Sequence, residues 1–243
     1  MFAAVTTAFG FLTRVPVPFV KADARTFGNA LAFFPVVGGG IGALLVAVVV
    51  GSGRVFTPHV GAFCVLVTWA MITGGLHLDG LADTFDGLGG GRGDRARVLQ
   101  IMQDSRIGTH GAVALFLVLL GKFLLLADLL THKGAGALWL APLAARTAVV
   151  VVIALFPYAR PDGLGKQMHD NARAHVLVVA HAFMLAGLWF AGFDRWPVLA
   201  AGHTAAVMFA LWITTKLGGL TGDTHGAIIE ISELAALTAL LVA

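Results

Sequence analysis

Three aspartates stand four and then three residues apart in the segment from Gly74 to Gly87. If this segment is helical, Asp79, Asp83 and Asp86 share one face. Three like charges on one face repel one another, so a chain with few charges is not expected to keep them without a cation. Carboxylate oxygens are ligands that Mg²⁺ prefers, and enzymes commonly use Mg²⁺ to bind a diphosphate. The spacing therefore predicts a magnesium site for a phosphorylated substrate.

A second acidic group lies near the C-terminus. Asp223, Glu230 and Glu233 are seven and three residues apart, which again places them on one helical face. The two glutamates fall inside an apolar segment, where ionisable groups are costly and normally face a partner or a polar interior. If this helix packs against the first acidic segment, the two groups complete a carboxylate-rich pocket.

Several cationic residues are candidates for pairing with these carboxylates or for binding phosphate. Arg146 lies in the middle of an apolar segment and needs an anion there, which is either Glu230 or Glu233 or a substrate phosphate. Arg160 and Lys166 lie in a loop with Gly and Pro, where they could clamp phosphate oxygens. Membrane topology alone would also explain these two cations.

The short segment Asp104-Ser105-Arg106 precedes another apolar segment and is a further candidate for chemistry on phosphate. A local ion pair between Asp104 and Arg106 is the structural alternative. His77 and His225 each adjoin an acidic motif, and we expect them to support the site rather than to react.

The composition predicts that these polar residues lie in a membrane protein. The 243 residues are 58% hydrophobic and 12% charged, and the mean hydropathy is +0.88. A helix needs about 20 residues to cross the hydrocarbon layer. About seven segments approach this length, with six or eight as alternatives: 31–50, 59–76, 111–130, 136–156, 175–193, 197–213 and 226–243. We therefore expect an all-α polytopic bundle that forms one catalytic membrane domain over residues 1–243.

The loops of this bundle indicate its orientation. With a cytoplasmic N-terminus, eleven Lys and Arg residues fall on the cytoplasmic side and three on the other, which is a clear positive-inside bias. The eleven are Arg14, Lys21, Arg25, Arg92, Arg95, Arg97, Arg106, Arg160, Lys166, Arg173 and Lys216, and the three are Arg54, Lys133 and Arg195. Basic loops also account for the net charge of +3, so no nucleic-acid partner is implied.

Several sequence blocks together resemble one family. The segment from Gly74 to Gly87, the run from Asp104 to Gly108, and the run from Leu220 to Asp223 followed by Glu230 and Glu233 are similar to the signature blocks of cobalamin synthases, the adenosylcobinamide-GDP ribazoletransferases. The N-terminal run from Phe11 to Pro18 and the loop from Tyr158 to Gly165 also resemble that family. The likeness covers nearly the whole chain in the right order.

This resemblance implies a multi-pass enzyme of the bacterial inner membrane, with its active site facing the cytoplasm, that acts late in cobalamin biosynthesis. Such an enzyme joins adenosylcobinamide-GDP to α-ribazole or α-ribazole 5′-phosphate, releases GMP and requires Mg²⁺ as its cofactor. A hydroxyl or phosphate oxygen of the ribazole attacks the phosphorus nearest the corrinoid, and Mg²⁺ and Arg stabilise the leaving group. The lipid bilayer is an implied partner, while a homo-oligomer and association with other cobalamin-assembly enzymes stay as alternatives.

The implied chemistry gives expected roles to individual residues. The expected metal ligands are Asp79, Asp83, Asp86, Asp104 and Asp223. The expected phosphate contacts are Arg14, Ser105, Arg160 and Lys166, while Arg106 and a general base, Asp86 or Asp104, form the catalytic group. The expected supporting residues are His77, Arg146, His225, Glu230 and Glu233.

Two other functions stay as alternatives. CDP-alcohol phosphotransferases also displace a nucleoside monophosphate with clustered aspartates, but the run from Asp79 to Asp83 lacks the Ala-Arg ending of their usual block. An ion or solute transporter would suit the intramembrane Glu230, Glu233 and Arg146. Against a transporter, the acidic residues concentrate at one face and the sequence contains no visible inverted repeat.

Overall fold

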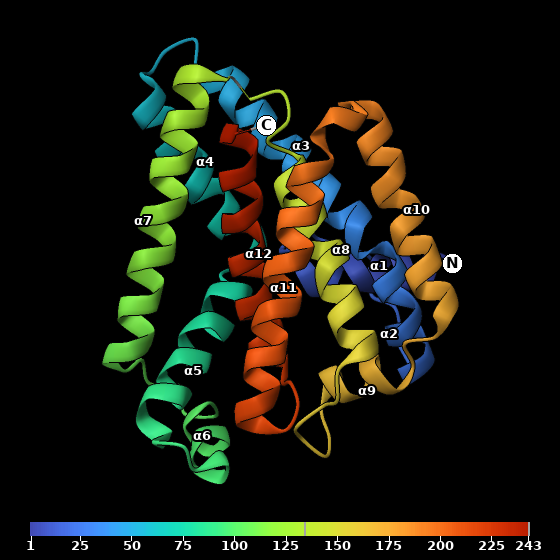
Figure 1. Cartoon of the computed structure of the whole chain (residues 1–243). Helices are drawn as coiled ribbons and strands as arrows, with labels where there is room; N and C mark the ends of the chain where they lie inside the picture. Colours follow the sequence, from blue (N-terminus) through green and yellow to red (C-terminus); the bar gives the residue numbers. More distant parts are fainter. Residues whose placement is uncertain (134, 243) are drawn as a thin grey trace.

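The chain folds into a bundle of helices joined by short loops (Figure 1). The computed structural model describes residues 1–133 and 135–242. In chain order the elements are α1 (Phe2–Leu12), α2 (Ala24–Ala30), η1 (Leu31–Phe33), α3 (Phe34–Ser52), α4 (Pro58–Thr73), α5 (Leu76–Gly91), α6 (Arg95–Ile101), α7 (Thr109–His132), α8 (Leu140–Leu155), α9 (Leu164–Asp170), α10 (Ala174–Ala191), η2 (Phe193–Arg195), α11 (Trp196–Leu217) and α12 (Gly222–Val242).

The prediction of an all-α polytopic bundle is confirmed, although the number of full-length spans is lower than about seven. Five helical segments of the described chain are long and apolar enough to cross a membrane, or six if α4 and α5 together form one broken span. Each of the seven expected segments coincides with a helix: α3, α4, α7, α8, α10, α11 and α12. Two of these helices are short, because α4 and α8 have 16 residues each.

The helix α4 is short because two consecutive glycines end it. Gly74 and Gly75 have φ angles of 63° and 72°, in the left-handed region that only glycine adopts at little cost. Their N–H groups donate to the carbonyl oxygens of Met71 and Ala70, which closes the last turn of α4. The next helix, α5, leaves at 86° to α4. The three aspartates therefore lie on a separate helix that does not continue the direction of α4.

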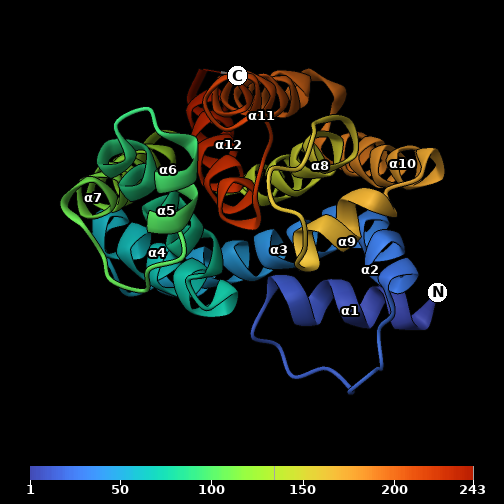
Figure 2. The same ribbon diagram turned by 90° about the horizontal axis from the view of Figure 1, so that it is seen from below.

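The C-terminal helix α12 lies at the centre of the bundle, between α5, α7, α8 and α11 (Figure 2). Its contact with α5 is close because small residues face each other. A Cβ on Gly80 would lie 2.6 Å from the carbonyl oxygen of Asp223, and a Cβ on Gly226 would lie 3.2 Å from the Cα of His77. This contact brings the second acidic segment against the first.

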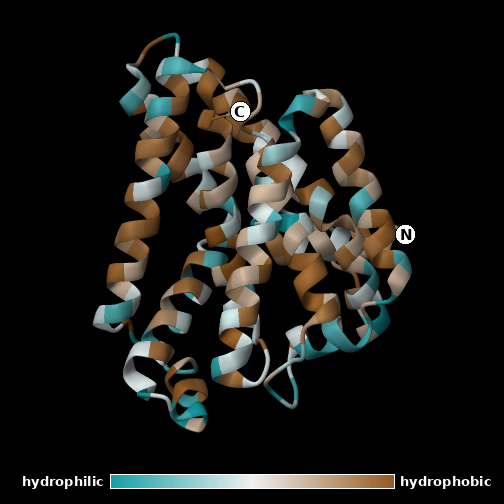
Figure 3. Ribbon diagram, viewed as in Figure 1, coloured by the Kyte–Doolittle hydropathy of each residue, from teal (hydrophilic) through white to brown (hydrophobic). Residues whose placement is uncertain are grey.

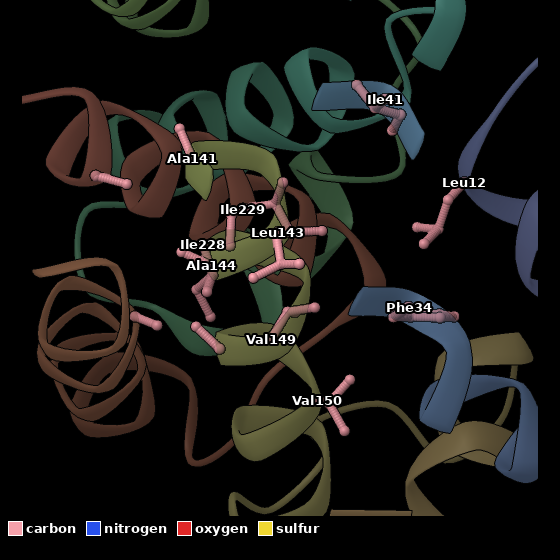
Figure 4. Packing of buried hydrophobic residues seen from close by; sticks show 14 of the residues in the cluster. Leu12, Phe34, Ile41, Ala141, Leu143, Ala144, Val149, Val150, Ile228 and Ile229 are labelled. Atoms are coloured by element: carbon pink, nitrogen blue, oxygen red, sulfur yellow. The ribbon is translucent and has the colours of Figure 1, made fainter. Parts of the chain in front are cut away.

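The helix α8 is buried on almost every side, which explains how so short a helix belongs to the core. Figure 4 shows Leu143 and Val149 of α8 near Ile228 and Ile229 of α12, with Phe34 of α3 on the other side. By contrast, hydrophobic residues run along the length of α7 and α10 at the outside of the bundle (Figure 3). On α7 the exposed apolar side chains include Val113, Phe116, Leu117, Leu120 and Leu124, as expected of a helix that faces lipid.

Candidate active site

Two loops that are far apart in sequence meet beside α5. The N–H of Ala159 donates to the carbonyl oxygen of Leu220 over 2.7 Å, and the N–H of Leu220 donates to the carbonyl oxygen of Pro157 over 2.8 Å. This short parallel pairing ties the loop after α8 to the loop before α12. As a result the guanidinium of Arg160 lies 2.7 Å from the carboxylate of Asp223.

A cavity of about 380 Å³, here called cavity A, opens between α5, α12 and this pair of loops. Its polar lining consists of His77 and Asp79 from α5, Asp223 and His225 from α12, and Gln103, Tyr158, Arg160 and Asp162 from other segments. Its apolar lining includes Phe11, Leu12, Phe34, Val149, Ile153, Met168 and Ile229. Cavity A thus combines an apolar wall with a cation and carboxylates, as ligand sites for amphiphilic molecules do.

A second cavity of about 360 Å³, here called cavity B, lies on the other side of Asp79. Its lining includes Arg14, Gly74, Gly75, Leu78, Ala82, Asp83, Ser105, Ile107 and Leu115. Leu76 and Asp79 line both cavities, so Asp79 is the carboxylate that they share. Each cavity also has one arginine, Arg160 in cavity A and Arg14 in cavity B. A phosphate group at Asp79 would have a guanidinium on either side.

The bend between α4 and α5 positions Arg14. The backbone N–H of Arg14 donates to the carbonyl oxygen of Ile72 over 2.7 Å. Its side chain lies directly over Gly74, where a Cβ would be 2.0 Å from Nε of the guanidinium. Only glycine at position 74 therefore allows both the left-handed turn and this placement of Arg14.

Asp79, Asp83 and Asp223 form the acidic part of the site. Asp83 interacts electrostatically with Asp79 and Asp223, and with Arg160 as the opposing charge. In residues 1–133 and 135–242 no three His, Cys, Asp or Glu side chains converge to hold a metal by themselves. Mg²⁺ usually binds through one or two carboxylates, with water and substrate phosphates as its other ligands. The donor set thus fits a Mg²⁺ that shares its coordination with a diphosphate, and it does not fit a metal enclosed by protein ligands alone.

Asp86 is held away from the cavities by the start of α7. Its carboxylate accepts hydrogen bonds from the N–H of Gly108 at 2.7 Å and the N–H of Gly111 at 2.8 Å. Gly108 is the N-cap residue of α7 and Gly111 lies in its first turn, where N–H groups have no acceptor within the helix. Asp86 is not among the described residues that line cavity A or cavity B. The structure therefore gives Asp86 an anchoring contact, and its expected roles as metal ligand and base stay predictions.

Three further residues expected in the site lie outside the described lining of both cavities: Asp104, Arg106 and Lys166. Asp104 and Arg106 form an ion pair at 2.6 Å, and the Arg106 side chain is 86% exposed. Hydrogen bonds from Arg106 lower the pKa of Asp104 to about 2, which makes this carboxylate a weak base at neutral pH. Lys166 binds Asp170 at 2.6 Å. Ser105, between Asp104 and Arg106, does line cavity B.

A buried charge network lies in the core behind the cavities. Lys122 of α7 binds Glu230 at 2.7 Å and also binds Glu233, while Arg146 of α8 forms an ion pair with Glu233. The ammonium of Lys122 also lies 4.5 Å from the centre of the Trp69 ring. Two cations and two anions neutralise one another, which is how charges are tolerated at membrane depth. The partner that the position of Arg146 required is thus Glu233.

The pairing of these four charged residues argues against the transporter alternative. None of Lys122, Arg146, Glu230 and Glu233 belongs to the described lining of cavity A or cavity B. The four groups satisfy one another rather than face a path for a solute. Their arrangement stabilises the helix contacts around α12.

Two residues outside the predicted site, Arg95 and Tyr158, also help to build it. Arg95 of α6 donates a hydrogen bond to the carbonyl oxygen of Ala159 at 3.3 Å, next to Arg160. The hydroxyl of Tyr158 accepts a hydrogen bond from the N–H of Gly222 at 3.2 Å. Burial raises the pKa of Tyr158, so its hydroxyl stays protonated at neutral pH. No signal in the sequence distinguishes Arg95 from the other basic residues of its loop.

Comparison with known proteins decides the family. The chain matches the model of the family described as Cobalamin-5-phosphate synthase over residues 4–241. The chain belongs to this family. The cobalamin-synthase resemblance predicted from the sequence blocks is thus confirmed, and it displaces the CDP-alcohol phosphotransferase alternative. No solved structure gives a significant match.

Curated relatives of this cobalamin-5-phosphate synthase family member carry one common name, adenosylcobinamide-GDP ribazoletransferase. The protein from Brevibacillus brevis is 38% identical over 240 residues, which cover 96% of each chain. The protein from Pseudomonas aeruginosa is 42% identical over 241 residues, covering 96% of this chain and 95% of the relative. The protein from Roseiflexus is 40% identical over 251 residues, covering 98% and 89%.

Proposed function

We propose that this protein is an adenosylcobinamide-GDP ribazoletransferase, which joins adenosylcobinamide-GDP to α-ribazole or α-ribazole 5′-phosphate and releases GMP. The observation that carries the proposal is the pair of cavities that meet at Asp79, with Arg160 in one and Arg14 in the other. Two substrates must meet at one phosphorus atom in this reaction. Two cavities with a shared carboxylate and a cation on each side suit that requirement.

The chemical step exchanges one phosphorus–oxygen bond for another. An acceptor oxygen of the ribazole forms a bond to the phosphorus that bears the corrinoid, and the bond from this phosphorus to the bridging oxygen breaks. GMP leaves with the bridging oxygen and its electron pair. When the acceptor is a hydroxyl, its proton passes to a carboxylate of the acidic group formed by Asp79, Asp83 and Asp223. Arg14 and Arg160 bind the phosphate oxygens on which negative charge increases.

We assign the ribazole to cavity A and the diphosphate to the boundary at Asp79. The wall of cavity A formed by Phe34, Val149, Ile153 and Ile229 suits the apolar benzimidazole base of the ribazole. A guanine base would need several hydrogen-bond partners that such a wall does not offer. A corrin ring is much larger than either cavity, so the corrinoid would remain outside while its GDP-bearing arm reaches Asp79.

Magnesium would be held by Asp79 and Asp83 together with the diphosphate, and it would supply positive charge to the leaving group. Asp223 has a different role in this arrangement, because it already pairs with Arg160. It orients the guanidinium toward cavity A. Asp104 and Asp86 would not be needed as ligands.

We further propose that the cavities face the cytoplasm from the bacterial inner membrane. The short helices α6 and α9 lie at the same end of the bundle, where they flank the loop that carries Arg160 (Figure 1). Most of the eleven basic loop residues belong to these segments and their neighbours. Positive charge of this density is typical of the cytoplasmic side, where the nucleotide substrate is available.

The direct test is GMP release by the purified protein in detergent with Mg²⁺, adenosylcobinamide-GDP and α-ribazole or its 5′-phosphate. We expect release that depends on both substrates. The variant Asp79→Asn should lose at least about 100-fold in turnover, as is typical when a charged group is removed from a phosphoryl-transfer site. The matched control Asp128→Asn changes an exposed aspartate on α7 and should keep wild-type turnover. Folded wild-type protein that releases no GMP with either acceptor would refute the proposed activity.

A further inference from the structure

His77 lies where cavity A meets the buried charge network. Its side chain is 3% exposed and belongs to the lining of cavity A. Nδ1 of its ring lies 3.3 Å from Nη2 of Arg146. Arg146 in turn is paired with Glu233, which also binds Lys122. The imidazole is therefore connected to the network through Nδ1.

The contact with Arg146 determines where the imidazole carries its proton. A guanidinium has N–H donors and no acceptor, so Arg146 donates and Nδ1 of His77 accepts. An accepting Nδ1 has its lone pair free of a proton. The proton of the ring must then be on Nε2, which makes Nε2–H a donor.

Nε2 of His77 has no hydrogen-bond partner among the residues that the structure describes, although it is buried. A buried donor without an acceptor is costly, and native structures rarely keep one without a reason. The cavity beside it is the place from which an acceptor can come. His77 thus has the properties of a binding residue that awaits an acceptor atom of a ligand.

The surroundings of His77 indicate which ligand atom would accept a hydrogen bond from Nε2. The apolar part of cavity A includes Val149 and Ile153 of α8, about one and two turns beyond Arg146 on the same helix, and Ile229 of α12, which is adjacent to Glu230 in sequence. The charged groups Arg160 and Asp223 lie at the loop side of the cavity. A ribazole bound with its sugar near these charges would direct its base toward His77. The base has one polar acceptor atom, the ring nitrogen that carries no sugar.

We propose that Nε2 of His77 donates a hydrogen bond to the unsubstituted ring nitrogen of the ribazole base, and that Arg146 is a positioning residue that fixes the required tautomer. This inference rests on the proposed function. It assigns recognition of the acceptor base to a residue on the same helix as Asp79. The buried charges then do more than stabilise the helix contacts, because they orient the imidazole of His77 that recognises the base.

Wild-type protein tests this proposal without any substitution. The probes are α-ribazole 5′-phosphate and the matched indole analogue, in which a C–H replaces the unsubstituted ring nitrogen. Because loss of one buried hydrogen bond leaves the His77 donor unpaired, we expect kcat/KM for the analogue to fall about tenfold or more. Equal kcat/KM values for the two acceptors would overturn the proposal. If the natural acceptor itself yields no GMP, the proposed function fails instead, and the two failures are thus distinguishable.

Two substitutions separate recognition by His77 from a structural role. The amide nitrogen of Gln can occupy the position of Nε2, whereas that of Asn occupies the position of Nδ1. We expect His77→Gln to keep a preference for the natural acceptor and His77→Asn to use both acceptors equally. The control His59→Asn changes an exposed histidine of α4 and should keep the wild-type preference. A His77→Asn protein that retains the full wild-type preference would contradict the proposal.

Discussion

The guanidinium of Arg160 lies 2.7 Å from the carboxylate of Asp223, and this ion pair joins the loop after α8 to the start of α12. Each side chain is partly exposed toward cavity A, so the pair can exchange part of its contact for a phosphate. The pairing of Ala159 with Leu220 fixes both backbones beside it. The two segments thus create one binding surface that neither forms alone.

The first prediction concerns the guanidinium of Arg160. Arg160→Ala should lower kcat/KM for GMP release by about 10²–10³, the usual effect of removing one donor to a developing negative charge. Arg160→Lys should recover only part of this loss, because an ammonium cannot bind two oxygens as a planar fork. Arg97→Ala, at an exposed position of α6, is the control and should behave as wild type. A loss of less than twofold in Arg160→Ala would exclude Arg160 as a phosphate ligand.

The second prediction concerns the metal. Removal of divalent cations with a chelator should stop GMP release, and added Mg²⁺ should restore it. Asp83→Asn should raise the Mg²⁺ concentration needed for half-maximal rate by about tenfold or more, as changes around metal sites do. Asp128→Asn should leave this concentration unchanged. Full activity in the presence of excess chelator would contradict a role for Mg²⁺.

The third prediction separates Asp86 from the other aspartates of α5. Asp86→Ala removes the acceptor of two N–H groups at the start of α7, and this should lower the stability of the protein by about 1–3 kcal/mol. Asp79→Asn should cause no such loss, because it removes one charge from a group of like charges. Thermal unfolding in detergent measures both effects. Equal melting temperatures for Asp86→Ala and wild type would show that the contact with α7 is dispensable.

The sequence predicts which residues share a helix face, but it does not predict which neighbouring residues they contact. The spacing of Asp79, Asp83 and Asp86 correctly indicated one helix, and the apolar setting of Arg146 correctly indicated an anionic partner. Helical periodicity cannot tell which neighbour a side chain faces, so the contact of Asp86 with α7 was not predictable. The sequence allows either mutual pairing of Asp104 and Arg106 or a role in the site, and only the loop conformation shows that the two residues pair.

The number of membrane spans is a second feature that hydropathy alone does not determine. Hydropathy merges α4 with the start of α5, because it does not report that Gly74 and Gly75 both adopt positive φ angles. It also gives α8 the appearance of a lipid-exposed span, although the short helix is surrounded by other helices. The local sequence does not reveal the partners of Lys122, since its two glutamates are more than 100 residues away. Long-range contacts of this kind are a property of the packing and not of local sequence.

The fourth prediction concerns the charge balance of the buried network. Lys122→Met leaves Glu230 and part of Glu233 unpaired, which should destabilise the protein by about 3–5 kcal/mol. The double variant Lys122→Met, Glu230→Gln removes one charge of each sign and leaves Arg146 paired with Glu233. It should therefore unfold at a higher temperature than the single variant. Lys216→Met, at an exposed position, is the control for loss of a lysine.

The comparison of the single and double variants tests whether the four charges compensate one another. If the double variant is as unstable as Lys122→Met, the loss comes from the packing of the lysine side chain against Trp69 and not from its charge. Melting curves recorded in the same detergent decide between these two explanations.

The fifth prediction uses the two glycines at the bend as a matched pair. Both have positive φ angles, so replacing either by Ala should cost about 1–2 kcal/mol of backbone strain. A Cβ at position 75 has no atom within 4 Å, whereas a Cβ at position 74 would lie 2.0 Å from Nε of Arg14. Gly74→Ala must therefore also displace the Arg14 guanidinium from cavity B. We expect KM for adenosylcobinamide-GDP to rise about tenfold or more in Gly74→Ala, as for loss of a charged hydrogen bond, and to stay near the wild-type value in Gly75→Ala. Equal KM values for the two variants would mean that Arg14 does not bind the diphosphate.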